Sequence, residues 1–170
     1  MLGLGAAIAE ATPAVPADAP PVSHENGVPA HAGVDALYEG MHQGYASLDA
    51  DGVGRLYTET AHYLSPQKDI KRGRTAIGEG FAGMFARAGE RGEHLDIRFR
   101  IVKRQARDDL VADVGYYTLR RSSGDGSGED TGKFVTVAER DASGAWRFSV
   151  DGYSAIRPWQ PGGSSGASGD

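Results

Sequence analysis

The chain has 170 residues, no cysteine and a formal net charge of −5 at pH 7. Its length suits one domain that buries a core of its own. The lack of cysteine excludes disulfides, thiolate metal sites and cysteine nucleophiles. Because the charges are spread along the chain rather than gathered in blocks, nucleic acid and anionic membrane surfaces are not expected as partners.

The N-terminal end predicts export. Residues 1–9, MLGLGAAIA, are apolar and lead into Ala9-Glu10-Ala11, a small-x-small pattern typical of a signal-peptidase site. The run is short and no basic residue precedes it, so a cytoplasmic protein with a disordered extension is the alternative. No apolar segment approaches the roughly 20 residues that cross a bilayer. We therefore predict a periplasmic or secreted protein without a membrane partner.

Composition divides the chain into three parts. Residues 1–33 end in a stretch rich in proline and alanine, which predicts a disordered linker whose His24 and His31 are solvated. Residues 158–170 are rich in glycine and serine and predict a disordered tail. The folded domain is expected over residues 34–157.

The first half of this domain has the pattern of three helices and a short strand. Apolar residues recur every three or four positions over residues 34–48, as on one face of a helix. A short second helix is expected over residues 53–57, and a strand over residues 61–65. A third helix follows Thr75, and its buried stripe is predicted to consist of Ile77, Phe81, Met84, Phe85 and Ala88.

The second half has the pattern of four long strands. Polarity alternates over residues 95–101, 110–120, 134–139 and 146–153, and an Asp-Ala-Ser-Gly turn joins the last two strands into a hairpin. In the last strand, strict alternation places Trp146, Phe148 and Val150 on one face, and Ser149, Asp151 and Tyr153 on the other.

The order of these elements resembles the nuclear transport factor 2-like superfamily, specifically its SnoaL-like and ketosteroid-isomerase-like branch. The segments that carry the resemblance are LYTETAHYLSP, GRTAIGEGFAGMF and FVTVAERDASGAWRFSVDGYS. The resemblance covers nearly all of residues 34–157. It implies an α+β fold in which a strongly curved antiparallel sheet wraps around three helices as a cone. It also implies an apolar pocket at the open end, a small and largely apolar molecule as ligand, and a homodimer formed through the sheet.

The residues that act in ketosteroid isomerases are replaced in this chain. The family's general base precedes the proline that ends the first strand, where this sequence has Ser65. The family's protonated aspartate aligns near Thr136, and its helix tyrosine near Met41. A serine hydroxyl is not a base of carboxylate strength. What matches other members of the branch is an aspartate in the last strand with an aromatic residue two positions later, here Asp151 and Tyr153.

Asp151 has two interpretations. If the cone encloses it, desolvation raises its pKa and suits it to proton transfer, with hydroxyl groups from Tyr63 and Tyr153 beside it. Alternatively, it accepts hydrogen bonds from a neighbouring element and fastens the sheet.

Two classes of function follow, and the sequence favours the first. The first is a ligand-binding protein without catalysis; the second is a cofactor-independent isomerase, cyclase or dehydratase. The histidine spacing predicts no metal site, and GRTAIGEG lacks the ending of a phosphate-binding loop, so no cofactor is expected. The residues expected to contact the ligand are Tyr38, His42, Tyr45, Ser65, Phe81, Phe85, Tyr117, Phe134, Thr136 and Ser149.

Overall fold

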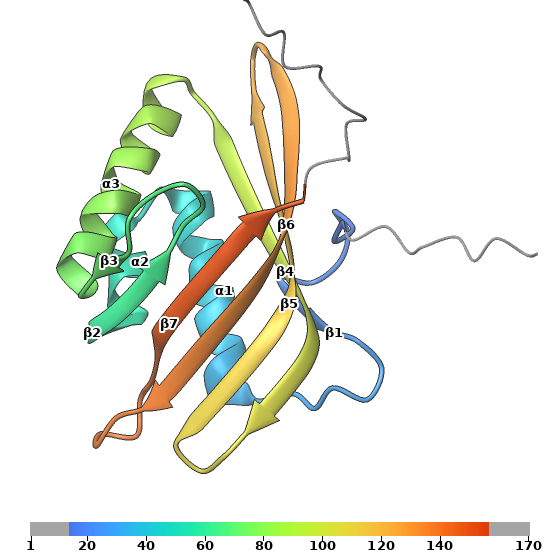
Figure 1. The fold of residues 1–170 in the computed structure, drawn as a ribbon. Helices are drawn as coiled ribbons and strands as arrows, with labels where there is room; N and C mark the ends of the chain where they lie inside the picture. Colours follow the sequence, from blue (N-terminus) through green and yellow to red (C-terminus); the bar gives the residue numbers. More distant parts are fainter. Residues whose placement is uncertain (1–13, 157–170) are drawn as a thin grey trace, which may run out of the picture.

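The computed structural model describes residues 14–156. The predicted signal segment, residues 1–9, and the predicted tail, residues 158–170, lie outside the described residues. Within the described range, no helix is both long and apolar enough to span a membrane. The elements, shown in Figure 1, are β1 (Val22–His24), α1 (Ala32–Ser47), α2 (Ala50–Arg55), β2 (Tyr57–Leu64), β3 (Lys71–Arg72), α3 (Arg74–Glu90), β4 (His94–Ala106), β5 (Leu110–Ser123), β6 (Gly126–Arg140) and β7 (Trp146–Ala155).

The strands form a single seven-stranded sheet in the order β1-β4-β5-β6-β7-β2-β3. Strands β4 to β7 are an antiparallel meander, and the sheet curves around one side of the helices (Figure 1). This confirms the predicted α+β class. Two pairs are parallel, β1 with β4 and β2 with β7, so the sheet is mixed rather than antiparallel throughout.

The helices bury the predicted stripes against the inner face of the sheet. Because apolar residues recur with helical spacing, α1 and α3 each present one continuous apolar side to the strands. The prediction is confirmed for both helices, although Met84 is only partly buried. The buried side chains are Val34, Leu37, Tyr38, Met41 and Tyr45 in α1, and Ile77, Phe81, Phe85 and Ala88 in α3.

The N-terminal segment is part of the fold, so the predicted linker is wrong for residues 14–33. Strand β1 pairs with the edge of β4, which offers unpaired backbone groups. Val15 is fully buried, and its N–H donates to Thr118 Oγ1 at 2.8 Å. The guanidinium groups of Arg98 and Arg120 donate to backbone carbonyls of the same segment. Backbone pairing and these arginines order a stretch whose own composition is poor in large apolar residues.

Tyr57 begins β2, whereas the sequence pattern placed it in the second helix. Helix α2 ends at Arg55, and Tyr57 pairs with Phe148 of β7. Its side chain is completely buried. Pairing with a long neighbouring strand outweighs the weak helical spacing of this short segment.

A β-bulge at Ser149 changes which side chains of β7 face inward. Ala138 pairs with Phe148 and Val137 pairs with Val150, so Ser149 has no partner across the ladder. The Ser149 hydroxyl instead donates to the Val137 carbonyl at 3.2 Å. As a result Phe148 lies on the same face as Asp151, which corrects the strict alternation predicted for this strand.

Candidate functional site

A cavity of about 270 Å³ lies between the helices and the inner face of the sheet. Side chains from α1, α3, β2 and β4 to β7 line it, and half of them are aromatic. The aromatic lining consists of Tyr38, Tyr45, Tyr63, Phe81, Phe99, Tyr117, Phe134, Phe148 and Tyr153.

The aromatic rings support one another around the cavity. Tyr153 packs on Tyr63 and Tyr117 with centroid separations of 5.8 and 5.7 Å, and Tyr38 packs on Phe99 at 5.0 Å. These separations are those of favourable tilted and edge-to-face pairs. The wall is therefore held in place by its own packing, which suits a preformed site for a flat or compact apolar molecule.

Asp151 is the polar group on the inner face of β7. It pairs with Tyr63 of β2 on one side and with Thr136 of β6 on the other, and all three side chains line the cavity. The Tyr57 hydroxyl donates to Asp151 Oδ2 at 2.6 Å. Burial raises the pKa of Asp151 to about 6, against the Tyr57 hydrogen bond, which lowers it. Both protonation states are thus accessible near neutral pH.

The tyrosines around Asp151 are neutral hydrogen-bonding groups. Burial raises the pKa of Tyr57, Tyr63 and Tyr45 well above the usual value, and the nearby Asp151 charge acts in the same direction. Burial also raises the pKa of Tyr117 to about 12. The hydroxyls of Tyr45, Tyr63 and Tyr117, which line the cavity, can donate a hydrogen bond to a ligand oxygen but do not ionise at physiological pH.

Tyr38, which lines the cavity, connects it to a buried polar network. Its hydroxyl donates to Asp113 Oδ2 at 3.0 Å and lies 2.7 Å from Thr136 Oγ1, which can donate to it in turn. Asp113 accepts two hydrogen bonds from Arg104, from Nε and Nη2, each at 2.8 Å. The side chains of Arg104 and Asp113 are 0% and 1% exposed, so this is a buried, bidentate ion pair.

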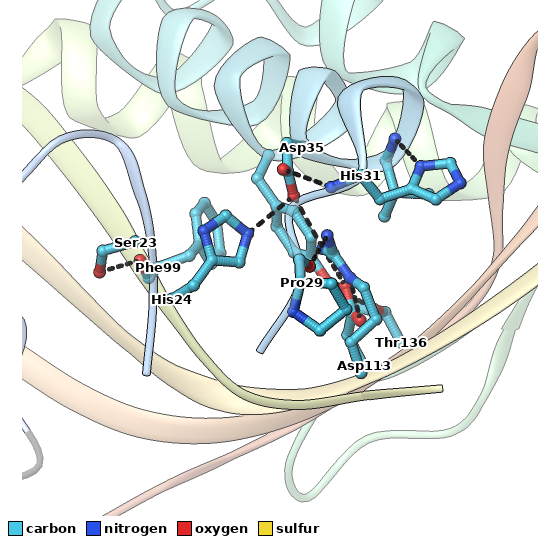
Figure 2. Close-up of polar contacts among 11 residues, drawn as sticks. Ser23, His24, Pro29, His31, Asp35, Phe99, Asp113 and Thr136 are labelled. Carbon is cyan, nitrogen blue, oxygen red and sulfur yellow. Dashed lines mark hydrogen bonds and ion pairs between the residues drawn. The ribbon is translucent and has the colours of Figure 1, made fainter. Parts of the chain in front are cut away.

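The same network ties the N-terminal segment to the domain (Figure 2). Arg104 Nη2 also lies 2.8 Å from Asp35 Oδ1, which contacts His24 Nε2 at 3.1 Å. Asp35 Oδ2 accepts from the His31 backbone N–H at 2.9 Å. Burial opposes the Arg104 charge, but the hydrogen bonds and charges of its two carboxylate partners outweigh it and raise the pKa of Arg104. His24 is therefore partnered, which corrects its prediction as a solvated residue.

An ion pair stands at another part of the cavity wall. Arg121 near the end of β5 pairs with Asp130 of β6, and both line the cavity. Their side chains are 37% and 56% exposed. Since the aromatic wall is largely buried, this exposed pair marks the solvent-facing mouth.

The structure brings most of the predicted site residues together. Those that line the cavity are Asp151, Tyr63, Tyr153, Tyr38, Tyr45, Phe81, Tyr117, Phe134 and Thr136.

Four predicted ligand contacts lie outside the lining. His42 Nδ1 hydrogen-bonds the Ile97 carbonyl at 2.8 Å. Phe85 packs behind Tyr45, with centroids 5.2 Å apart. Ser65 follows the end of β2, and Ser149 is turned away by the bulge.

Sequence reasoning missed Tyr57, Arg104, Asp113, Arg121 and Asp130. Asp113 could have been predicted from the sequence. It lies on the same face of β5 as the inward-facing Tyr117, where a charged residue is unexpected. Arg104 could not have been predicted in this way, because a register shift between Ile101 and Lys103 changes which residues of β4 face inward. Among residues 14–156, no cluster of three or more histidine or carboxylate side chains is arranged to hold a metal ion.

Comparison with known proteins shows the fold. The Streptomyces protein Aln2 is 19% identical and aligns with a TM-score of 0.65 over 75% of this chain and 94% of its own. A ketosteroid isomerase-like protein from Erwinia carotovora is 15% identical, with a TM-score of 0.61 over 75% of this chain and 96% of its own. An NTF2-like protein with a cystatin-like fold from Novosphingobium aromaticivorans is 16% identical, with a TM-score of 0.63 over 79% and 83%.

The chain therefore has the nuclear transport factor 2-like fold, and the resemblance predicted from the sequence is confirmed at that level. No protein-family model and no curated protein matches the sequence.

Proposed function

We propose that this protein binds a small, largely apolar organic molecule in the cavity, with Asp151 as its principal polar contact. The observation that carries the proposal is an aromatic cavity of about 270 Å³ with a carboxylate on its inner wall. Ligand sites are typically apolar hollows with few polar groups, and this volume lies near their lower limit, which favours a ligand of one to three rings. The structural likeness to NTF2-like and ketosteroid isomerase-like proteins is consistent with such a role.

Filling the cavity is expected to weaken binding. A neutral naphthalene carboxamide is a suitable fluorescent probe, because its flat apolar body matches the wall. Met84 lines the cavity, and Met84→Trp places a larger side chain there. We expect the dissociation constant, measured by fluorescence titration, to rise at least about tenfold. The larger side chain displaces the probe from apolar contacts that contribute to its affinity.

The matched control is Ile70→Trp, which adds the same side chain at a position that is 44% exposed and outside the lining. It is expected to leave the affinity unchanged. Equal affinity of both variants and the wild type would place the probe elsewhere and refute the proposed site.

The environment of Asp151 favours a second candidate, a cofactor-independent isomerase, cyclase or dehydratase. A carboxylate whose pKa is raised to about 6 is a competent general base near neutral pH. In this proposal Asp151 removes a proton from carbon next to a ligand carbonyl. The hydroxyls of Tyr63 and Tyr153 stabilise the developing oxyanion. Tyr57 holds the carboxylate in place through its 2.6 Å hydrogen bond. Solvent deuterium exchange into enolisable ketones tests this activity.

We also propose that the outer face of the sheet forms a homodimer. Val114 and Val135 are paired across β5 and β6 and are each 47% exposed. Leu64, 39% exposed, extends the row, because it and Val135 lie on either side of Gly152. Exposed β-branched side chains grouped on a sheet face favour association.

Val135→Lys is expected to convert the dimer to a monomer, because it places a charge in the centre of this row. Sedimentation velocity measures the change, and Ile70→Lys, at an exposed position outside the row, is the control that stays dimeric. A monomeric wild type, or a Val135→Lys variant that remains dimeric, would contradict the proposal. The proposed export is tested separately by mass spectrometry of the mature N-terminus.

A further inference from the structure

Arg121 gives the cavity mouth a chemical preference that the aromatic wall does not have. Among the described residues that line the cavity, Arg121 is the only cation. It lies opposite Leu95 of β4 and Gly128 of β6, close to the end of the sheet where Asp130 also lines the wall. Its positive charge acts on the hydroxyls of Tyr45 and Tyr117, against the burial that raises both pKa values. The Arg121 guanidinium is therefore exposed to solvent, and its charge also reaches groups inside the cavity.

The partner of Arg121 is exchangeable. Asp130 is 56% exposed, and an ion pair with this exposure contributes little to stability. The Arg121 charge also helps to lower the pKa of Glu93, but Glu93 is already paired with Arg91 at 2.7 Å. A carboxylate from a ligand can therefore replace Asp130 on Arg121 at small cost, and the planar guanidinium binds such a group through two hydrogen bonds.

Resting on the proposed binding function, we propose that the ligand is an amphipathic carboxylic acid whose apolar body fills the aromatic cavity and whose carboxylate binds Arg121. The partly buried Asp151 fixes the orientation, because two carboxylates repel each other within the low-dielectric interior. A ligand carboxylate is excluded from the Asp151 end and accepted at the mouth. A hydrogen-bond donor on the apolar body suits the Asp151 end.

The test compares a naphthalene carboxylate with the corresponding neutral carboxamide by fluorescence titration at pH 7.5. Wild type is expected to bind the carboxylate severalfold more tightly, the scale of a partly exposed charge-assisted pair. Arg121→Gln is expected to remove this preference and leave the carboxamide affinity unchanged. Asp130→Asn is expected to strengthen carboxylate binding severalfold, because the competing anion is gone. A purely structural role of the pair does not predict these opposite effects.

Arg120→Gln is the matched control. Arg120 is the neighbour of Arg121 in β5, but it pairs with Glu129 and contacts Val15 on the outer face, so the preference is expected to remain. Equal binding of the two probes to wild type, or a preference that survives in Arg121→Gln, overturns the assignment and leaves the proposed binding function standing. Binding of neither probe overturns both.

Discussion

Arg104→Met is expected to lower the free energy of unfolding by about 3–5 kcal/mol, the cost of leaving a buried charge without its partner. Arg104 and Asp113 are almost completely buried and joined by two hydrogen bonds of 2.8 Å. Removing the guanidinium leaves Asp113 with the Tyr38 hydroxyl alone and also leaves Asp35 without its cation. Urea denaturation followed by circular dichroism measures the loss.

Two further variants distinguish the effect of breaking the buried Arg104–Asp113 pair from the effect of losing any positive charge. Arg91→Met breaks the Arg91–Glu93 pair at the surface and is expected to have little effect on the free energy of unfolding. The double variant Arg104→Met/Asp113→Leu is expected to recover part of the lost stability, because apolar side chains replace the buried pair while Asp35 stays without its cation. A loss for Arg104→Met no larger than that for Arg91→Met would show that the network contributes little to the fold.

Asp151→Asn is expected to reduce any catalysed proton exchange by at least about 100-fold, since an amide is not a base. In the wild type the active form is the carboxylate. Because the pKa of Asp151 lies at about 6, the exchange rate is expected to rise with pH and to level off above it. Deuterium incorporation into a panel of enolisable ketones, followed by NMR, measures both effects. Equal turnover by wild type and variant, or no turnover by either, would rule out the enzymatic candidate and leave the binding function.

The stability of Asp151→Asn distinguishes a functional carboxylate from one that fastens the sheet. Burial raises the pKa of Asp151 from 3.8 to about 6, so the folded state holds its proton more tightly than the unfolded state. The wild type therefore loses stability as pH rises from about 4 to 6, by roughly 2–3 kcal/mol in all. Asparagine removes this loss and still accepts the Tyr57 hydrogen bond. The variant is expected to be more stable than wild type at pH 8, whereas a fastening role predicts lower stability.

The sequence was sufficient for the class of fold because its main signals are local. Helical spacing identified the buried faces of α1 and α3, and alternation identified the four long strands. Tyr63, Phe134 and Thr136 were expected at the site, and each of them lines the cavity.

The errors fall where structure depends on distant partners. The bulge at Ser149 arises from pairing between β6 and β7, and no local sequence pattern predicts it. Tyr57 joins a strand because β7 runs beside it, and the segment around Val15 is ordered by side chains more than 80 positions away. The mouth pair was missed for a different reason. Arg121 and Asp130 flank a glycine-rich turn that resembles a solvated loop, although β5 and β6 continue through it as a paired ladder.

A crystal structure of the protein with the naphthalene carboxylate tests the central claim most directly. We expect the ring system between Tyr63, Tyr153 and Phe81, with the carboxylate within hydrogen-bond distance of Arg121 and Asp151 facing the bound molecule. A probe bound on the outer face of the sheet, or a cavity closed by side chains with Asp151 turned away from it, would contradict the account.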